Sequence, residues 1–583
     1  MTSRGHTFAG DERDSISLAI VGSGGAGALT VGALLLDVAA RAGWYGLMTR
    51  SVGPQIRGGE AAALLRLAAV PVECMAASFD LIIAIDWRNA GRFAAEMPLS
   101  RDGLAVGDPR GGEVPEAIMA SGAERIDIPM KDMAKNIPDG RPNMIALGIA
   151  AGLLGLPQVA LFEVMEKRLA DKGKRAVAAS RAAIEAGFSE AGTIKRTFRL
   201  AAPDRGGAGR WLITGNEATG LGAVRGGIRF AAAYPITPAT EILEWLAPVL
   251  SGLGGALVQA EDELGSVNMA IGASFGGKPA LTATSGPGLA LMIESLGLAT
   301  AAEVPILIID VMRGGPSTGI PTKSEQSDLN IAVYGCHGDA PHIVVAPLSV
   351  GDCLFTTQWA VHLAEATQTP AIVLSDQFLG QARAVIDRPA DVAFLATRRV
   401  AERSSENAYC RYAVTADGVS PMALPGMAGG QYTADGLTHN SAGLPSSQAH
   451  DHHDQLAKRR RKIEGFAYGH HWANIEGDGD VALLTWGSLT GAAREAQRLL
   501  AAQGIATRLV ALRLLSPLQT EALAEALTGA ERVLVIEQSE GAQFHRHLRA
   551  QCDLPGEVRR LSRAGPRLIG PEEICAAVRQ WRS

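Results

Sequence analysis

The sequence predicts a multi-domain α/β protein, and three observations support this fold class. Short apolar runs bounded by turn residues alternate with helical patterns along most of the 583 residues. Regular alternation of this kind is typical of a parallel sheet covered by helices on both faces. A chain of this length has room for three or four domains, each with its own core. Its 68 glycines follow no triplet period, which suits many tight turns between strands and helices.

The first predicted domain, residues 15–200 after a polar tail at 1–14, begins in a Rossmann-like way. The apolar run 17–22 predicts a strand, and the turn GSGGAG leads into a helical pattern. Such a turn lets backbone N–H groups and a helix N-terminus approach a phosphate. The glycines that match G-x-G-x-x-G are Gly22, Gly24 and Gly27. The acidic residue that dinucleotide sites carry about 20 residues later is missing, so a turn without a ligand and a nucleotide-dependent dehydrogenase both stay open.

A second glycine-rich loop follows in the same domain. Residues 51–59 read SVGPQIRGG and include Arg57. The apolar run at 79–85 predicts another buried strand.

The second predicted domain covers residues 211–388. The strands that we expect there lie at 256–259, 279–283, 305–310, 342–345 and 370–375. Open α/β sheets bind ligands at the carboxyl ends of their strands, so the polar segments that follow these strands are the candidate site. One is Thr284-Ser-Gly-Pro-Gly288, which on its own is also an ordinary strand-end turn.

Two further segments follow strands of this domain. The run AEDELG at 260–265 offers three carboxylates, which as a bare pattern also favour a helix start. Residues 313–329 read RGGPSTGIPTKSEQSDL, a stretch too rich in Gly, Pro, Ser and Thr to be regular structure. Arg313 is suited to a planar carboxylate held by two parallel hydrogen bonds. A surface loop with an incidental arginine is the alternative.

Residues 389–477 have poor periodicity and many turn residues, which indicates a connector between domains. Two of its features could be functional: the histidines near His450 could bind a metal, and KRRRK at 458–462 could be a docking patch. We expect both to be solvated faces of a linker helix instead, and we assign no metal ligand.

The last predicted domain, residues 478–583, alternates strands and helices again. The expected strands lie at 481–486, 507–511 and 532–537, with helices at 490–502 and 518–527. We assign no catalytic residue to it.

Charge and cysteine content limit the partners and cofactors. The net charge is −6, without a basic footprint for nucleic acid. No uncharged apolar run reaches the roughly 18 residues that span a bilayer, so no membrane segment is expected. The N-terminus lacks an apolar export signal and the six cysteines are scattered, which favours a reducing, cytoplasmic location. No CxxC pair occurs, so the chain lacks local ligands for an iron–sulfur cluster.

Taken whole, residues 313–329 and YPITP at 234–238 resemble the alpha subunit of 2-oxoacid:ferredoxin oxidoreductases, most closely the 2-oxoglutarate type. The 51–59 loop resembles G-P-x-x-R-G-G of that family's gamma-type domain. The second domain is similar to the pyrimidine-binding domain of thiamine diphosphate enzymes. The last domain is similar to the C-terminal domain of transketolase-like enzymes.

The resemblance implies roles for individual residues. Glu263 matches the glutamate that hydrogen-bonds the aminopyrimidine of thiamine diphosphate and favours its imino tautomer. The other cofactor-binding residues implied are Tyr234, Ile236, Ser285 and Gly286. The substrate-binding residues implied are Arg313, Thr237, Thr322 and Lys323, the lysine suiting the distal carboxylate of 2-oxoglutarate. The residues implied for coenzyme A are Gly22, Gly24, Gly27 and Arg57.

The resemblance also implies a partner. The G-D-G…N run that would hold Mg²⁺ and diphosphate is absent from the chain. A beta subunit would therefore bring diphosphate binding, Mg²⁺ and a [4Fe–4S] cluster, in an (alpha–beta)₂ assembly that reduces ferredoxin. The implied reaction converts 2-oxoglutarate and coenzyme A to succinyl-CoA and CO₂. Pyruvate, branched-chain 2-oxoacids and indolepyruvate are alternative substrates, and a non-catalytic scaffold subunit is the alternative of another class.

Overall fold

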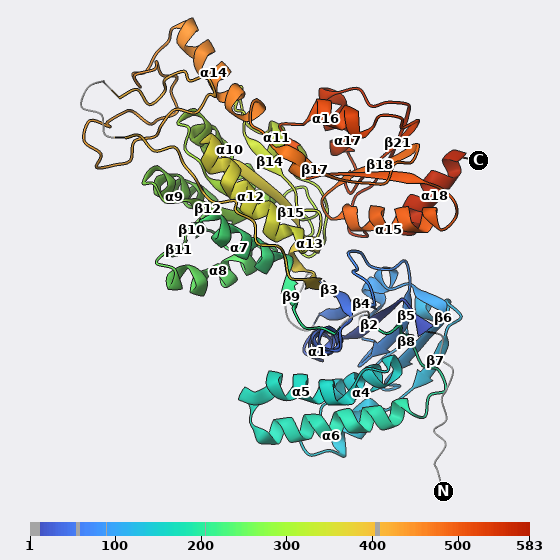
Figure 1. Ribbon diagram of the computed structural model, residues 1–583. Helices are drawn as coiled ribbons and strands as arrows, with labels where there is room; N and C mark the ends of the chain where they lie inside the picture. The colour runs from blue at the N-terminus through green and yellow to red at the C-terminus, as the bar shows by residue number, and fades with distance from the viewer. Residues whose placement is uncertain (1–11, 54–58, 89, 204–205, 403–408, 583) are drawn as a thin grey trace. The chain divides into compact units, whose positions relative to one another are not determined.

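The computed structural model describes residues 12–53, 59–88, 90–203, 206–402 and 409–582. The chain forms two compact units (Figure 1). Unit 1 contains residues up to Ile213 together with Ala382–Arg388, and unit 2 contains Thr214–Gln381 and Pro389–Ser583.

Unit 1 is built on an eight-stranded mixed sheet in the order β7-β6-β5-β2-β4-β3-β16-β9. Strands β5, β6 and β7 run parallel to β2, whereas β4 pairs antiparallel with both β2 and β3. The strands are β2 (Ser15–Ser23), β3 (Tyr45–Val52), β4 (Glu60–Ala68), β5 (Phe79–Ala84), β6 (Leu99–Gly107), β7 (Glu124–Asp127), β9 (Arg210–Thr214) and β16 (Arg383–Asp387). A short parallel pair joins β1 (Glu12–Arg13) and β8 (Arg199–Leu200).

Helices complete unit 1. They are α1 (Ala28–Ala42), α2 (Glu116–Met119), α3 (Met130–Lys135), α4 (Pro142–Leu154), α5 (Gln158–Leu169) and α6 (Lys174–Ala191), with 3₁₀ turns at Ala90–Glu96 and Ala170–Lys172. Helices α4 and α5 both pack against α6 (Figure 1). Helix α4 is apolar on nearly every face and is buried throughout, as expected for a central core helix.

The boundary of the second domain differs from the expected range 211–388. Strand β16 (Arg383–Asp387) pairs antiparallel with β3, so it belongs to the sheet of unit 1. The chain leaves unit 1 after Ile213 and returns to it at Ala382. A strand reads the same locally whichever sheet it joins, so sequence patterning could not reveal this return.

Unit 2 is built on a seven-stranded sheet in the order β11-β10-β12-β13-β15-β14-β20, parallel except for β20. Its strands are β10 (Phe230–Ala233), β11 (Ala256–Gln259), β12 (Ala280–Thr284), β13 (Leu307–Met312), β14 (Ile343–Val345), β15 (Ala371–Asp376) and β20 (Leu514–Ser516). All five strands predicted for this region are confirmed, with ends that agree within two residues.

Helices precede, connect and follow these strands. They are α7 (Gly215–Gly226), α8 (Thr240–Gly252), α9 (Glu263–Phe275), α10 (Gly286–Ala301), α11 (Leu329–Tyr334), α12 (Asp352–Thr367) and α13 (Gln377–Gln381). Helix α7 packs against α12, and α9 packs against α10. The predicted parallel sheet with helical connections is therefore confirmed.

The C-terminal part of unit 2 has a second sheet, in the order β17-β19-β18-β21-β22. Its elements are β17 (Ala473–Glu476), β18 (Val481–Trp486), β19 (Thr507–Leu512), β21 (Arg532–Glu537), β22 (Glu557–Ser562), α15 (Leu489–Ala501), α16 (Thr520–Ala526), α17 (Gln543–Gln551) and α18 (Pro571–Arg582). Strand β20 of this part pairs antiparallel with β14, so it extends the other sheet. One apolar core runs through both sheets.

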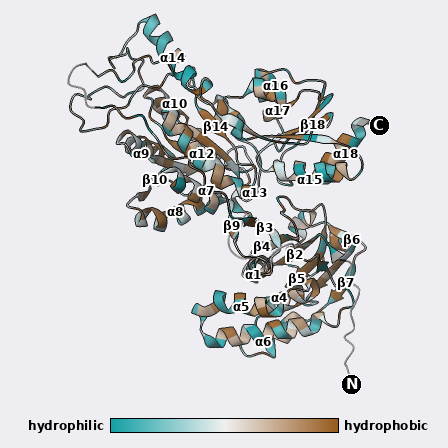
Figure 2. Cartoon of the chain, in the orientation of Figure 1, coloured by the Kyte–Doolittle hydropathy of each residue, from teal (hydrophilic) through white to brown (hydrophobic). Residues whose placement is uncertain are grey.

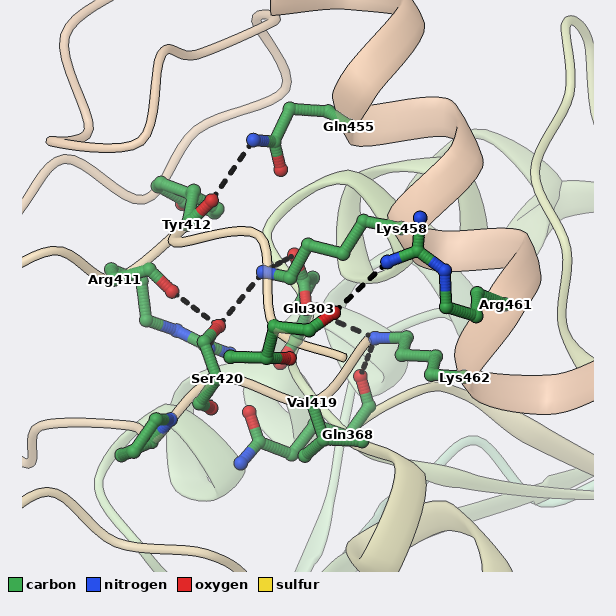
Figure 3. A network of polar contacts seen from close by, with 12 residues as sticks. Glu303, Gln368, Arg411, Tyr412, Val419, Ser420, Gln455, Lys458, Arg461 and Lys462 are labelled. Carbon is green, nitrogen blue, oxygen red and sulfur yellow. Dashed lines mark hydrogen bonds and ion pairs between the residues drawn. The ribbon is translucent and has the colours of Figure 1, made fainter. Parts of the chain in front are cut away.

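The connector is closely packed against the rest of unit 2, and one expectation for it was wrong. Helix α14 (Ala449–Glu464) is strongly hydrophilic and is teal in Figure 2. The side chains of Lys458 and Lys462 are nevertheless 0% exposed. Both bond to the carboxylate of Glu303, at distances of 2.8 and 3.1 Å (Figure 3). KRRRK is therefore in part a buried anchor rather than a solvated face.

The pKa values in this cluster follow from its burial and charges. Burial would raise the pKa of Glu303, but Lys462, Lys458 and Arg411 outweigh it and hold that pKa below its ordinary value. Burial lowers the pKa of Lys462 to about 7, against the attraction of Glu303. The guanidinium of Arg411 donates to the Glu303 carbonyl and to the Ser420 carbonyl, so the connector is bonded to the chain just after α10.

Within the described residues, no helix is long and apolar enough to cross a membrane.

Candidate active site

Four neighbouring strands of unit 2 end at the segments that carry the predicted site residues. The strands lie in the order β11-β10-β12-β13 and run parallel, so their carboxyl ends share one edge of the sheet. Residues 234–238 follow β10, 260–263 follow β11, 285–288 follow β12, and Arg313 follows β13. This is the edge at which open α/β sheets bind ligands.

The three carboxylates after β11 lie in different environments. Asp262 is the N-cap of α9, and its side chain accepts a hydrogen bond from the backbone N–H of Gly265 at 2.7 Å. Glu261 is exposed. Glu263 is the first residue of α9 and is only 7% exposed. The helix start that the sequence left open as an alternative is thus formed by Asp262, which leaves Glu263 as the buried acid.

Glu263 lies against the loop after β12. A Cβ atom on Gly288 would fall 2.6 Å from Cγ and 2.8 Å from Oε1 of Glu263, so only glycine permits this approach. The Glu263 carboxylate makes no hydrogen bond or ion pair to any residue that the structure describes. This carboxylate is therefore available to a ligand.

The N-terminus of α10 contributes two further predicted residues. Ser285 is the N-cap of this helix, and its buried hydroxyl has no hydrogen-bond partner among the described residues. Gly286 is the first helical residue, and a Cβ atom there would lie 2.7 Å from both carboxylate oxygens of Asp328. Both positions are therefore adapted to close approach by other groups.

The segment 234–238 contacts Arg313 directly. Tyr234 is 41% exposed, and Ile236 packs in part against the core. The guanidinium Nη1 of Arg313 donates to the carbonyl of Thr237. The structure thus brings together two segments that lie 76 residues apart in the chain.

Arg313 is 6% exposed, an unusual degree of burial for arginine. Burial lowers its pKa, and the negative charges of Asp328 and Asp310 oppose this shift. Its Nε has no partner among the described residues. The interpretation of residues 313–329 as a surface loop with an incidental arginine therefore fails at Arg313 itself.

The loop after Arg313 turns back on itself. Gly314 donates its N–H to the carbonyl of Lys323 at 3.0 Å and accepts from Ile320 at 2.8 Å. Residues 315–320 between them are exposed, whereas Thr322 and Lys323 are partly buried. Both predicted substrate-binding residues therefore lie on the returning side of the loop, near its base.

Glutamines from the C-terminal part hold this loop, and the sequence analysis missed them. The backbone N–H of Gln326 donates to the carbonyl of Gln538 at 2.9 Å, and Gln538 returns a bond to Gln326 Oε1 at 2.8 Å. The amide of Gln543 donates to the Ser327 carbonyl and accepts from the Asn330 N–H, each at 2.8 Å. Gln543 is the first residue of α17, which follows β21.

The glycine-rich turn of unit 1 is held by protein groups. Gly24 donates its backbone N–H to the carbonyl of Gly59, so the two glycine-rich loops meet. Gly27 has a φ of 86°, and a Cβ atom there would lie 2.3 Å from Nδ2 of Asn143. Gly22 ends the buried part of β2. Arg57 lies outside the described residues.

The turn does not belong to a simple dinucleotide-binding unit. In that unit a strand, a helix and the next parallel strand are neighbours. Here β4 lies between β2 and β3 and pairs antiparallel with both. The histidine-rich start of α14 is exposed at His450, and no group of three or more His, Cys, Asp or Glu residues able to hold a metal was found in the described ranges.

Comparisons with known proteins agree with these three regions of the chain. Residues 17–190 match the family described as pyruvate ferredoxin/flavodoxin oxidoreductase. Residues 221–459 match the family described as pyruvate flavodoxin/ferredoxin oxidoreductase, thiamine diP-bdg. Residues 471–561 match the transketolase C-terminal domain.

Individual relatives are similar over most of their length. The 2-oxoglutarate synthase subunit KorA of Methanothermobacter marburgensis is 35% identical over 372 residues, which cover 62% of this chain and 97% of that protein. The 2-oxoacid:ferredoxin oxidoreductase 2 subunit alpha of Aeropyrum pernix is 31% identical over 470 residues, which cover 74% of this chain and 72% of that protein.

A solved structure extends the similarity to the whole chain. The 2-oxoglutarate:ferredoxin oxidoreductase of Magnetococcus marinus, solved with 2-oxoglutarate, coenzyme A and succinyl-CoA bound, is 34% identical and has a TM-score of 0.90. The match covers 98% of this chain and 100% of that one. With relatives above 30% identity covered almost completely, the chain belongs to the 2-oxoacid:ferredoxin oxidoreductase family.

Proposed function

We propose that this subunit acts in the oxidative decarboxylation of 2-oxoglutarate with coenzyme A, giving succinyl-CoA and CO₂ and passing electrons to ferredoxin. The observation that carries the proposal is that two buried charged residues, Glu263 and Arg313, follow strands at the same edge of the sheet. Glu263 presents a carboxylate without a protein partner, and Arg313 presents a guanidinium beside Thr237. The names of the relatives, which act on 2-oxoglutarate or on 2-oxoacids, support the substrate class.

The residues around Glu263 fit the pyrimidine half of thiamine diphosphate. A carboxylate that is buried and unpartnered can accept a hydrogen bond from a protonated ring nitrogen. The hydroxyl of Ser285, which has no partner among the described residues, could hydrogen-bond to the same ring. Tyr234 and Ile236 would contact the same ligand. When bound, thiamine diphosphate supplies the electron sink for decarboxylation, while Glu263 holds the proton at the pyrimidine nitrogen.

Arg313 and its loop would bind the 2-oxoacid. A guanidinium whose Nε is unpartnered can hold a carboxylate in a planar, charge-assisted arrangement. Thr237 and Thr322 would line the pocket. Lys323 would lie toward the distal carboxylate, which 2-oxoglutarate has and pyruvate lacks. A site built for a polar group rejects an analogue that leaves it unpaired, so Lys323 favours the dicarboxylate.

Unit 1 would bind coenzyme A. The turn that contains Gly22, Gly24 and Gly27 meets the 53–59 loop through the Gly24–Gly59 hydrogen bond, so one surface can use both. Arg57 in that loop could bind a phosphate. The Magnetococcus marinus relative was solved with coenzyme A and succinyl-CoA, which supports this part of the proposal.

The subunit would complete its active site with a beta subunit. The chain contains neither a diphosphate–Mg²⁺ motif nor four neighbouring cysteines, so the beta subunit would bring Mg²⁺ and the [4Fe–4S] cluster. We infer an (alpha–beta)₂ assembly in the cytoplasm, with ferredoxin as the electron acceptor.

Co-expression with the beta subunit tests this proposal. The complex should reduce a viologen dye in the presence of a 2-oxoacid and coenzyme A, and the subunit purified alone should not. Activity from the lone subunit would overturn the division of the site. A complex that binds its cofactor yet oxidises none of a panel of 2-oxoacids would instead favour a non-catalytic scaffold.

A further inference from the structure

Two carboxyl groups next to Arg313 have no role in the proposed chemistry. Asp310 lies in β13, three residues before Arg313, and is completely buried. Asp328 stands immediately before α11, at the end of the loop that Arg313 begins. Neither oxygen of Asp310 has a hydrogen-bond donor among the described residues, and the same holds for the buried Oδ2 of Asp328.

Two neighbouring carboxylates cannot both stay ionised in such a place. Burial, and next the negative charge of Asp328, raise the pKa of Asp310 well above its ordinary value. Burial also raises the pKa of Asp328, while hydrogen bonds from Ser327 and Asp310 oppose the shift. Asp310 is therefore the group of the two that holds a proton more tightly.

Contacts connect this pair to both loops of the site. The hydroxyl of Ser327 lies 2.8 Å from Oδ1 of Asp328 and 2.8 Å from the carbonyl oxygen of Arg313. The carboxylate of Asp328 fills the space that a side chain on Gly286 would need. Asp328 thus touches the N-terminus of α10 and, through Ser327, the backbone of Arg313.

The charged groups around the pair are few. Arg313, at the end of β13, is the cation whose pKa both aspartates raise. Glu325, in the loop, adds negative charge that raises the pKa of Asp328. With one proton shared, the pair carries one negative charge and Arg313 one positive charge.

We propose that Asp310 and Asp328 share a single proton and form a positioning pair, which fixes the Arg313 loop against α10 and balances the Arg313 charge. This inference rests on the proposed function, in which Arg313 binds a 2-oxoacid carboxylate. The pair does not touch the reacting atoms. If it loses the shared proton, it gains a second negative charge close to the carboxylate-binding group. Substrate binding then weakens, whereas the chemical step is unchanged.

The test compares variants of Asp310 in the complex with the beta subunit. In Asp310→Asn the amide N–H replaces the shared proton and cannot be lost. Wild type should show KM for the 2-oxoacid rising about tenfold at alkaline pH, the order expected when one more unit charge appears near a charged ligand in a partly buried site. Asp310→Asn should keep a near-normal KM at neutral pH and lack the alkaline rise, with little change in kcat.

Two further variants show whether the effect is specific. Asp310→Ala leaves Oδ2 of Asp328 without a donor, so KM should be about tenfold higher at every pH. Asp553→Asn changes a carboxylate whose side chain is 96% exposed, and it should behave as wild type. A near-normal KM in Asp310→Asn together with a raised KM in Asp310→Ala identifies the hydrogen bond, because Asn keeps a hydrogen-bond donor and Ala does not.

Infrared spectroscopy of the full chain gives a readout that needs no activity. The wild-type spectrum at neutral pH should contain the C=O stretch of a protonated carboxyl group that Asp310→Asn lacks and Asp553→Asn retains. Absence of that difference overturns the inference. A wild-type KM without an alkaline rise, or a rise that persists in Asp310→Asn, also overturns it. If the band is present but the wild-type complex oxidises no 2-oxoacid, the proposed function fails while the shared proton stands.

Discussion

Glu263→Gln is expected to abolish most of the activity without weakening the fold. Losing an acid–base partner lowers a rate by roughly 10²–10⁴, which corresponds to about 3–5 kcal/mol of activation free energy. The amide has nearly the shape of the carboxylate, so the contact with Gly288 is preserved. The Glu263 carboxylate has no hydrogen-bond or ion-pair partner among the described residues, so the change leaves no such partner unsatisfied.

Stability should therefore stay nearly the same, since the change removes no bond within the protein. The assay is steady-state dye reduction by the complex with the beta subunit, together with a urea unfolding curve of the variant chain. Glu261→Gln is the matched control, because Glu261 belongs to the same acidic run and is exposed. Near-normal kcat in Glu263→Gln, or an equal loss in Glu261→Gln, would refute the reasoning.

Three further predictions follow from other parts of the chain. Glu303→Gln should lower the free energy of unfolding by about 3–5 kcal/mol, the usual cost of leaving buried charges without their partner, and an unchanged urea midpoint would contradict it. Because the folded-state pKa of Glu303 lies below its ordinary 4.5, wild type should lose this stability as pH falls below that value, and the variant should not. Lys323→Met should lower kcat/KM for 2-oxoglutarate and leave kcat/KM for pyruvate unchanged. A wild-type complex that prefers pyruvate would contradict the role of Lys323. Arg57→Ala should raise the KM for coenzyme A and leave unchanged the reduction of the bound cofactor by the 2-oxoacid in the absence of coenzyme A. An equal loss of both half-reactions would mean that Arg57 has a structural role.

Much of the fold could be predicted because the signals are local. Apolar runs such as 256–259 and 481–486 became strands with the same ends, β11 and β18. Periodicity depends on neighbours within one element, so it reports the element and not its pairing. For that reason the sequence did not show that β16 returns to the sheet of unit 1, or that β20 extends the sheet that contains β14.

The candidate site was foreseen only in part, for a similar reason. The rule that ligands lie at the carboxyl ends of parallel strands pointed to the segments after these strands. The family resemblance then singled out Glu263, Ser285 and Arg313 within them. The same rule could not find Asp310, because within an apolar strand its carboxyl group has no visible partner. Nor could it find Gln538, which bonds to Gln326 from 212 residues away.

By itself, then, the sequence determined the order of strands and helices, the glycine-rich turns, and which polar residues follow which strand. The tertiary structure decided which charges are buried and what surrounds them. Lys458 and Lys462 look like solvated residues of a hydrophilic helix, yet they enclose Glu303, a residue 155 positions earlier in the case of Lys458. Burying a charge is tolerable only when a partner is in place, and the partner is supplied by long-range folding that no local pattern records.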